Sequence, residues 1–246
     1  MSIAAVMQPT YLPWIGYFDL IDQVDVFVFY DDVQVVKGTW GMRNRIKNSG
    51  GQQFLTVPLQ KTKSKFETTF VDAQLNAVIN WRRKHLSAIR TNYTKAPYFN
   101  ELFPQLESWL NEDFQNLAEL NIGLITHFSN YIGLDTVLRR SSEMDGLEGV
   151  KDERLVPLLR QIGCKEYLSP IGAMEYINRN KKGGVFADYD ISLFYHQFEH
   201  PEYQQLFGDF VSHMAIIDVL FNVGPEGTLK LIRAGRRPRV FFEDAE

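Results

Sequence analysis

Cysteine is nearly absent from the chain, and long apolar runs are missing. The single cysteine among 246 residues, Cys164, excludes a disulfide framework and a cysteine-rich zinc site. Because it lies in an apolar segment, we interpret Cys164 as a buried, inert thiol rather than a nucleophile. No stretch approaches the roughly 18 apolar residues that span a bilayer, and the N-terminus shows no secretory signal pattern. These absences predict a cytoplasmic protein without a membrane span.

Hydrophobic residues make up 45% of the chain and charged residues 23%, which is typical of a soluble globular protein. A core of ordinary size is therefore expected to hold the fold without a metal or a disulfide. No repeat or low-complexity tract divides the sequence, so we expect a single domain over residues 1–246. Its sub-parts would be residues 1–135 and 136–236, followed by a partly ordered tail over residues 237–246.

An excess of positive charge is also lacking: the net charge is −4, which argues against a general nucleic-acid-binding protein. The charge is uneven, however, because residues 33–66 hold seven basic residues and no acidic one, and more follow on a predicted helix. The basic residues are Lys37, Arg43, Arg45, Lys47, Lys61, Lys63 and Lys65, and then Arg82, Arg83, Lys84, His85 and Arg90. Such a zone suits a small anionic ligand or an acidic partner protein, and a solvated basic face is the alternative.

Two apolar runs near the N-terminus frame a loop with two prolines. The first run, residues 3–7, leads through this loop into a helical pattern that begins near Trp14. The second run, residues 26–30, stops at the carboxylate pair Asp31 and Asp32. Strand, loop, helix and strand in this order are typical of the first unit of a parallel α/β sheet. Because such sheets bind ligands at the carboxyl ends of their strands, we expect the site there.

The rest of the chain alternates between helical and strand patterns around a helical middle block, which predicts an α/β domain with a helical part. Gly133 is the expected C-cap of the longest of these helices. Helices are expected over residues 76–92, 100–110, 114–132, 151–163, 171–178 and 211–221, strands over 136–140, 167–169 and 191–195, a hairpin over 44–59 and a loop over 61–65.

Three patterns resemble known motifs but lack the context that their chemistry needs. Residues 196–200 spell the inverted metalloprotease signature, which requires a helix, whereas Pro201 and the preceding strand pattern favour a turn. Residues 224–230 lack the spacing of a phosphate-binding loop, and we expect a plain helix N-terminus near Glu226. Ser169 has no nucleophile elbow around it, so a helix N-cap is the alternative to a role in substrate binding. No metal site is expected.

The most unusual segment is Gln8-Pro-Thr-Tyr-Leu-Pro-Trp-Ile-Gly-Tyr-Phe18, and it resembles the WbqC-like family, known mainly from bacterial gene clusters for O-antigens and other surface glycans. The resemblance covers almost the whole chain and implies a part in building a modified sugar for a surface polysaccharide. Departures from the family pattern are Pro170 and Ala215, where glycine and serine are commoner, and residues 41–43 before Asn44. The other resembling segments are residues 25–34, 44–46, 55–58, 96–99, 167–169, 200–204 and 217–222, with Trp81, Lys84, His85 and Tyr93.

The order of the first elements is also similar to the start of nucleotidylyltransferases. By this likeness we expect a Rossmann-like, nucleotidylyltransferase-like parallel sheet in the N-terminal part, a helical middle block and a smaller α/β C-terminal part. Those enzymes carry H-x-G-H where the loop meets the helix, whereas residues 14–17 of this chain are Trp-Ile-Gly-Tyr. Without the histidines, adenylyl transfer by that route loses its main charge stabilisers.

Three residues are candidate general bases. Asp31 or Asp32 could take a proton from a sugar amine, and a loop or cap carboxylate is the alternative. His85 is a candidate because the unperturbed pKa of histidine lies near neutrality, and its neighbour Lys84 would favour the neutral form if the two approach each other. A structural histidine on a helix is the alternative for His85.

Eleven side chains are predicted to contact substrate. Tyr11 and Trp14 can stack on a sugar, a base or pantetheine, with core packing as the alternative. Arg45 could clamp a diphosphate in a bidentate manner, with a surface salt bridge as the alternative. Asp218 and Asn222 lie one helical turn apart and need polar partners wherever they are buried. The full set is Gln8, Tyr11, Trp14, Lys37, Asn44, Arg45, Lys84, Ser169, His200, Asp218 and Asn222.

These observations lead to the hypothesis of an enzyme that transfers an acyl or aminoacyl group from a thioester to the amino group of a nucleotide-linked sugar. The thioester would be carried by coenzyme A or an acyl carrier protein, and no bound cofactor is expected. Attack on a thioester needs neither a metal nor a cysteine. The alternatives are an ATP-using adenylate-forming ligase or nucleotidylyltransferase, and a non-catalytic partner in a glycan-assembly complex.

Overall fold

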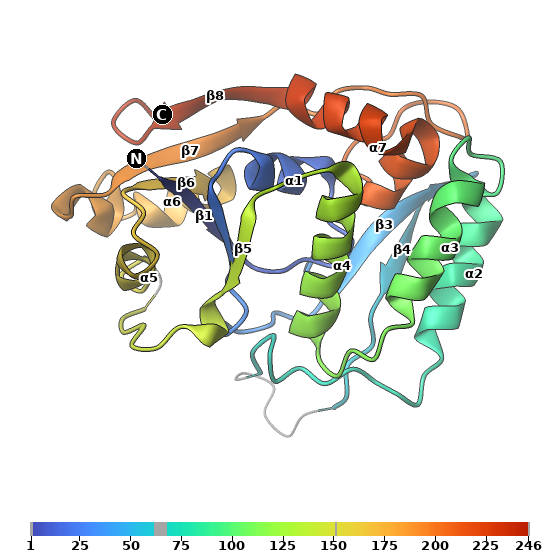
Figure 1. The fold of residues 1–246 in the computed structure, drawn as a ribbon, viewed down its shortest axis with the longest axis horizontal. Helices are drawn as coiled ribbons and strands as arrows, with labels where there is room; N and C mark the ends of the chain where they lie inside the picture. The colour runs from blue at the N-terminus through green and yellow to red at the C-terminus, as the bar shows by residue number, and fades with distance from the viewer. Residues whose placement is uncertain (1, 62–67, 151, 246) are drawn as a thin grey trace.

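The computed structural model describes residues 2–61, 68–150 and 152–245 (Figure 1). The described residues form a six-stranded sheet, a separate two-stranded hairpin and surrounding helices. The strands are β1 (Ile3–Met7), β2 (Val26–Phe29), β3 (Arg43–Asn48), β4 (Gly51–Thr56), β5 (Val137–Arg140), β6 (Glu166–Pro170), β7 (Ser192–Phe198) and β8 (Arg236–Phe241). The α-helices are α1 (Ile15–Asp22), α2 (Trp81–Tyr93), α3 (Phe99–Leu110), α4 (Leu117–Ile132), α5 (Leu155–Gln161), α6 (Met174–Ile177) and α7 (Ile216–Gly235). Short 3-10 helices are η1 (Ser141–Glu143), η2 (Ile171–Ala173) and η3 (Gly184–Asp188).

The main sheet has the strand order β5-β2-β1-β6-β7-β8. All neighbours pair in parallel except β8, which is antiparallel to β7. The predicted α/β class is therefore confirmed as a mixed sheet of mostly parallel strands with helices. One sheet takes strands from both predicted sub-parts. Because β1 is central, the chain adds strands first on one side of it and then on the other.

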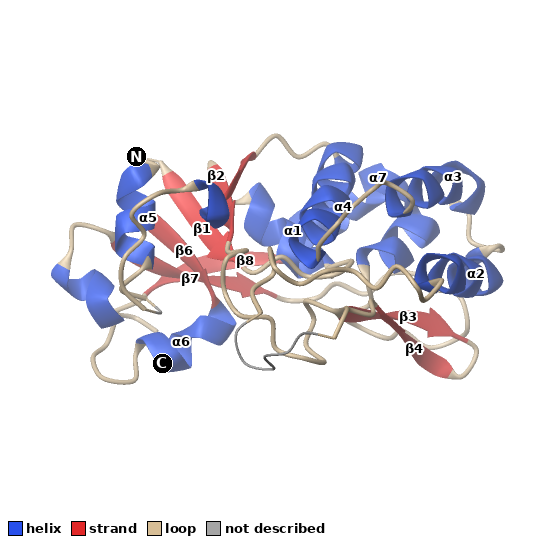
Figure 2. Ribbon diagram, turned by 90° about the horizontal axis from the view of Figure 1, so that it is seen from below, coloured by secondary structure: helices blue, strands red, loops and turns tan. Residues whose placement is uncertain are grey.

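Helices cover both faces of the main sheet (Figure 2). α1, α4 and α7 belong to one hydrophobic cluster, and α5 and α6 contribute to a second. Successive side chains of a strand point to opposite faces, so Ala5 joins the first cluster and Ala4 and Val6 join the second. Burial on both faces explains why the opening apolar run does not alternate with polar residues. None of the described helices is both long and apolar enough to cross a membrane.

Asparagine side chains set where α2 and α4 begin. α4 follows Asn116, whose side chain accepts a backbone hydrogen bond at 2.9 Å, and it ends at Gly133, the predicted C-cap, with a φ of 87°. The helix predicted from residue 76 begins only at Trp81. The reason is that Asn76 caps a preceding turn, and Asn80 is the N-cap of α2.

The C-terminal segment differs from the prediction. Residues from 237 onward were expected to form a partly ordered tail, but Arg236–Phe241 forms β8 at the edge of the sheet. Arg236 pairs with Asp19 at 2.9 Å, and Arg237 pairs with Glu199 at 2.7 Å. The charges that make this segment resemble a solvated tail therefore attach it to the fold. Of the loop predicted over residues 61–65, only Lys61 lies within the described residues.

The last helix begins later than predicted. The pattern from residue 211 indicated a helix, but α7 starts at Ile216, because His213 has a φ of 59° and Ala215 is extended. Gly224, with a φ of 72°, kinks α7. A Cβ at Gly224 would lie 2.5 Å from the Tyr98 ring, so both the backbone conformation and the close approach require glycine.

Gly224→Ala is expected to lower the free energy of unfolding by about 2–4 kcal/mol, because it adds a steric clash to the cost of a left-handed alanine. Gly163→Ala is the matched control, since Gly163 has a φ of 69° and open space around its Cβ position. The control should lose only about 1–2 kcal/mol. Urea denaturation measures both values, and equal losses would contradict the role of Tyr98.

Candidate functional site

A cleft of about 580 Å³ opens at the carboxyl ends of β1 and β6. The order of the sheet reverses between these two strands, which is where α/β sheets bind ligands. The described residues that line the cleft carry no carboxylate, lysine, arginine or histidine. Such a surface suits a flat, neutral group such as a nucleobase or a sugar ring. The lining includes Gln8, Tyr30, Trp40, Tyr167, Pro170 and Tyr176.

A smaller pocket of about 210 Å³ adjoins the cleft and shares Trp40 with it. Arg45 lines this pocket and is held in place by three acceptors. Its guanidinium donates to Gln52 Oε1 at 2.8 Å, to the His213 carbonyl at 3.2 Å and to the Ser212 carbonyl at 3.3 Å. The pocket therefore adds one fixed cation to an otherwise uncharged cleft.

His213 also lines the smaller pocket, with its ring 4.5 Å from that of Trp14. Burial and the positive charge of Arg45 lower the pKa of His213, so its imidazole is neutral at pH 7. Nδ1 lies 2.9 Å from Ser212 Oγ, and Nε2 has no hydrogen-bond partner among the described residues. The left-handed backbone of His213 is unusual for a residue with a Cβ, and such residues cluster at functional sites.

Amide side chains hold the loop between β1 and α1 that carries Trp14. Asn44 donates to the Tyr11 carbonyl at 3.1 Å and to the Leu12 carbonyl at 2.8 Å. Asn121 donates to the Pro9 carbonyl at 2.9 Å. Asn44, predicted to contact substrate, thus borders the smaller pocket while its amide fixes the loop.

The carboxylate pair after β2 is occupied by ion pairs. Asp31 is fully buried and accepts a hydrogen bond from Arg140 Nε at 2.8 Å. Asp32 pairs with Arg154 and accepts a hydrogen bond from Ser141 Oγ at 2.6 Å. Neither carboxylate lines the cleft. The two carboxylates thus connect the end of β2 to the end of β5 through Arg140, and to the start of α5 through Arg154.

His85 and Tyr11 form a buried pair behind the loop. The Tyr11 hydroxyl lies 2.9 Å from Nδ1 of His85, and Nε2 lies 3.2 Å from the Thr56 carbonyl. Nε2 therefore donates to Thr56, and Tyr11 donates to Nδ1. Burial lowers the pKa of His85 to about 4, so the ring is neutral. Both side chains pack against Trp81, and the structure places them in the core rather than in the cleft.

Asp218 lies at the centre of a buried polar cluster. It accepts hydrogen bonds from the Tyr93 hydroxyl at 2.5 Å, the Tyr203 hydroxyl at 2.6 Å and Gln205 Nε2 at 2.9 Å. Burial raises the pKa of Asp218. Asn222 donates to the Asp218 carbonyl at 2.7 Å. Neither Asp218 nor Asn222 lines the cleft or the smaller pocket.

The other predicted contact residues lie at separate places. Gln8 lines the cleft, and Lys37 is exposed on a nearby loop. His200 stacks on Trp14 with 5.9 Å between ring centroids. Ser169 is buried at the end of β6 and donates to the next carbonyl, so the helix-cap alternative is wrong for it.

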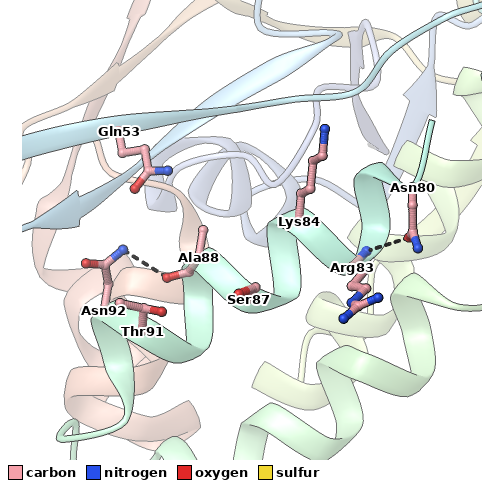
Figure 3. Close-up of a pocket in the computed structure, with 8 residues that line it drawn as sticks. All are labelled: Gln53, Asn80, Arg83, Lys84, Ser87, Ala88, Thr91 and Asn92. Atoms are coloured by element: carbon pink, nitrogen blue, oxygen red, sulfur yellow. Dashed lines mark hydrogen bonds between the residues drawn. The ribbon is translucent and has the colours of Figure 1, made fainter.

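Lys84 lies on α2 (Figure 3) and does not line the cleft. With Arg83 it lines an open hollow of about 620 Å³, and Gln53 from β4 faces α2 across it. Lys84 therefore lines neither the cleft nor the smaller pocket.

The metalloprotease-like pattern lies on β7 and the loop after it, which confirms that it is not helical. His196, expected in a turn, lies in the strand with Nε2 2.7 Å from Asp19 Oδ2. Cys164 is buried, as predicted. Across residues 2–61, 68–150 and 152–245, no three His, Cys, Asp or Glu side chains form a group that could hold a metal ion.

Among the residues of the two cavities that the sequence analysis did not single out are Trp40, Tyr176 and His213. A signal existed for Trp40, because a tryptophan between Gly38 and Gly41 in a basic loop has no apolar pattern to bury it. No sequence signal joins His213 to a pocket formed mainly by residues 7–45.

Comparison with known proteins identifies a family. The model of the WbqC-like protein family matches residues 8–230. An uncharacterised protein of Mycobacterium tuberculosis is 37% identical over 228 residues, which is 92% of this chain and 96% of the relative. No solved structure matches the chain.

The buried neutral state of His85 predicts a pH dependence of stability. Its folded pKa of about 4 lies below the ordinary value of 6.5, so the unfolded chain takes up the proton first as the pH falls. This contribution is complete above pH 6.5 and is lost as the pH falls toward 4. Between about pH 7.5 and 5 the wild type should lose about 2 kcal/mol more unfolding free energy than His85→Gln.

Urea titrations at the two pH values measure this difference. Asn92→Gln, which lies on the same helix α2 and removes no titratable group, is the control and should keep the wild-type pH dependence. Identical pH dependence in wild type and His85→Gln would show that His85 is not held neutral.

Proposed function

The chain belongs to the WbqC-like protein family, and on that premise we propose an enzyme of bacterial surface-polysaccharide biosynthesis. Its reaction would transfer an acyl or aminoacyl group from a thioester to the amino group of a nucleotide-linked sugar. The observation that carries this proposal is the uncharged aromatic cleft between β1 and β6, which opens into a pocket containing Arg45 and His213.

The topology of the sheet supports nucleotide binding at this place. Counted along the chain, the strands of the main sheet run in the order 3-2-1-4-5-6, which is the order of Rossmann sheets. The finer Rossmann-like class is our interpretation of this order. In such sheets the ligand lies in the crevice at the carboxyl edge, and here that crevice is the cleft.

The two cavities divide the parts of a nucleotide sugar between them. Trp40 and Tyr176 offer aromatic faces on which a base or sugar ring can stack. Arg45 presents a guanidinium to the pyrophosphate, and Lys37 on the neighbouring loop adds a second positive charge. Gln8 provides a hydrogen-bonding side chain in the cleft.

We assign the general base to His213 in place of His85, Asp31 and Asp32. Nε2 of a neutral imidazole can take a proton as the sugar nitrogen attacks the thioester carbonyl carbon. The new C–N bond forms, the C–S bond breaks, and the proton passes to the departing thiolate. His85 has both ring nitrogens engaged, and the two carboxylates are ion-paired and do not line the cleft.

ATP chemistry is the second candidate because the fold order also suits nucleotidylyltransferases. Trp14 and Tyr17, at the positions where those enzymes have histidines, both line the smaller pocket. Aromatic rings there provide stacking but no charge for a phosphoryl group. A third candidate, a non-catalytic partner in a glycan-assembly complex, would leave the cleft without a ligand.

Binding of nucleotide sugars should depend on the cleft. The panel is dTDP-, UDP- and GDP-linked amino sugars, ATP and acetyl-coenzyme A, tested by thermal shift and then by calorimetry. Tyr176→Ala should raise the dissociation constant for the preferred nucleotide sugar at least about tenfold, because it removes a stacking ring. Tyr189→Ala is the matched control, since Tyr189 is 44% exposed and Tyr176 43%, and Tyr189 does not line the cleft. A stabilising shift with ATP alone would favour the ligase, and no shift with any ligand would favour the non-catalytic partner.

His213→Asn should lower kcat for acyl transfer by about 10²–10⁴, the usual contribution of a general base. Asparagine is chosen because it tolerates the left-handed backbone at this position. The dissociation constant for the nucleotide sugar should stay within about threefold of wild type, so that the loss lies in the chemical step. Thioester consumption monitored through the released thiol gives kcat, and His127→Asn is the control. Unchanged kcat in His213→Asn would remove His213 from the mechanism.

A further inference from the structure

Helix α2 and its surroundings form a strongly basic surface. Residues 73–100 contain five cations and no acidic residue. Because the whole chain has a net charge of −4, the residues outside this segment carry −9. Positive charge is therefore concentrated on this segment and on the basic residues of 33–66, in a protein that is acidic elsewhere. The five cations are Arg82, Arg83, Lys84, Arg90 and Lys95.

These cations are not neutralised by the fold. None of the five forms an ion pair with a carboxylate of a described residue, whereas Arg140, Arg154 and Arg236 each do. Arg82 feels the negative charge of Asp113 but donates its hydrogen bond to a backbone carbonyl at 2.7 Å. Charge of this kind is available to a partner.

Helix stability does not explain the placement of these charges. Arg82, Arg83 and Lys84 occupy the first turn of α2, which has no acidic residue. The helix dipole is positive at this end, so cations here disfavour the helix. Residues that destabilise their own helix without gaining a contact in the fold are expected at functional sites.

The surface around these cations is open and partly apolar. Arg83 lines a hollow of about 620 Å³ toward β4 (Figure 3). It also lines a second hollow, of about 410 Å³, toward α3. Val78 is 94% exposed and Ile79 42% exposed, immediately before Asn80, which lines both hollows. Glu107 faces the hollow toward α3, so a negative partner is directed to the side of β4. Lys84 lies on that side.

We propose that this surface docks an acidic helix of a partner protein, and that the partner is a carrier protein bearing the thioester donor. The identity of the partner rests on the proposed function. Charge complementarity argues for an acidic protein, and exposed Val78 and Ile79 provide the apolar contact that protein interfaces add to charge. An open face with spread cations suits an extended helix better than a small anion, which requires converging donors.

The test uses the full chain and a purified bacterial acyl carrier protein, both as the holo form and with an acetyl thioester. Binding is measured by calorimetry over a range of ionic strength. Arg83→Glu combined with Lys84→Glu should weaken binding at least tenfold, and the affinity of the wild type should fall as salt rises. The double variant should melt no lower than wild type, because glutamate is favourable in the first turn of a helix.

Arg179→Glu combined with Lys182→Glu is the matched control. It makes the same change in net charge at two exposed residues outside α2, and carrier binding should be unaffected. Equal weakening by both double variants would overturn the proposal by showing general charge attraction. Absence of carrier binding up to about 1 mM would also overturn it. If free acetyl-coenzyme A binds the wild type but not the Arg83→Glu, Lys84→Glu variant, the surface is a small-anion site and the proposal is overturned.

The failure of this proposal differs from the failure of the proposed function. Tyr176→Ala alters the cleft, so it should reduce nucleotide-sugar binding while leaving carrier binding intact. Carrier binding to α2 in a protein that binds no nucleotide sugar would keep the docking surface and remove the proposed acceptor. Nucleotide-sugar binding without carrier binding would keep the proposed acceptor and remove the docking surface.

Discussion

The loop between β1 and α1 is the constraint on which the rest of the site depends. It is buried without being helix or strand, so its carbonyls need hydrogen-bond donors from elsewhere in the chain. Asn44 and Asn121 supply them, and they hold Leu12 at a φ of 46°, which an apolar side chain rarely adopts. A buried carbonyl without a donor costs about 1–3 kcal/mol, so this loop conformation is stable only with both amides in place.

The same loop joins parts of the molecule that are far apart in the sequence. The Tyr11 N–H donates to the Trp40 carbonyl at 2.9 Å, and the Ile216 N–H donates to the Pro13 carbonyl at 2.9 Å. The segment before the hairpin, the loop and the start of α7 therefore meet beside the smaller pocket, which Trp40 and Pro13 line. Walls fixed by a shared set of backbone bonds need little reorganisation when a ligand enters, which favours affinity and catalysis.

Local patterns predicted the elements whose causes are local. β1, α1 and β2 follow from apolar runs, and Gly133 follows from the need for a left-handed residue after α4. The surroundings of the candidate site residues depend instead on partners far away along the chain. His85 contacts Tyr11, which is 74 residues away, and Asp31 contacts Arg140, which is 109 residues away, so neither contact could be inferred from the sequence. When the hydrogen-bond or ion-pair partner of a titratable residue lies far away along the chain, the sequence does not reveal the contact. The residue then looks available for catalysis.

The central position of β1 also affects when the sheet can assemble during synthesis. β1 pairs with β2 on one side, but its other neighbour is β6, where Ile3 aligns with Glu166. At about 5–20 residues per second, a ribosome needs roughly 10–30 s to deliver β6 after β1. During that time one edge of an apolar strand has no partner, which is a template for mispairing. The centre of the sheet is thus the first part to be synthesised, and it is completed only after β6 has been made.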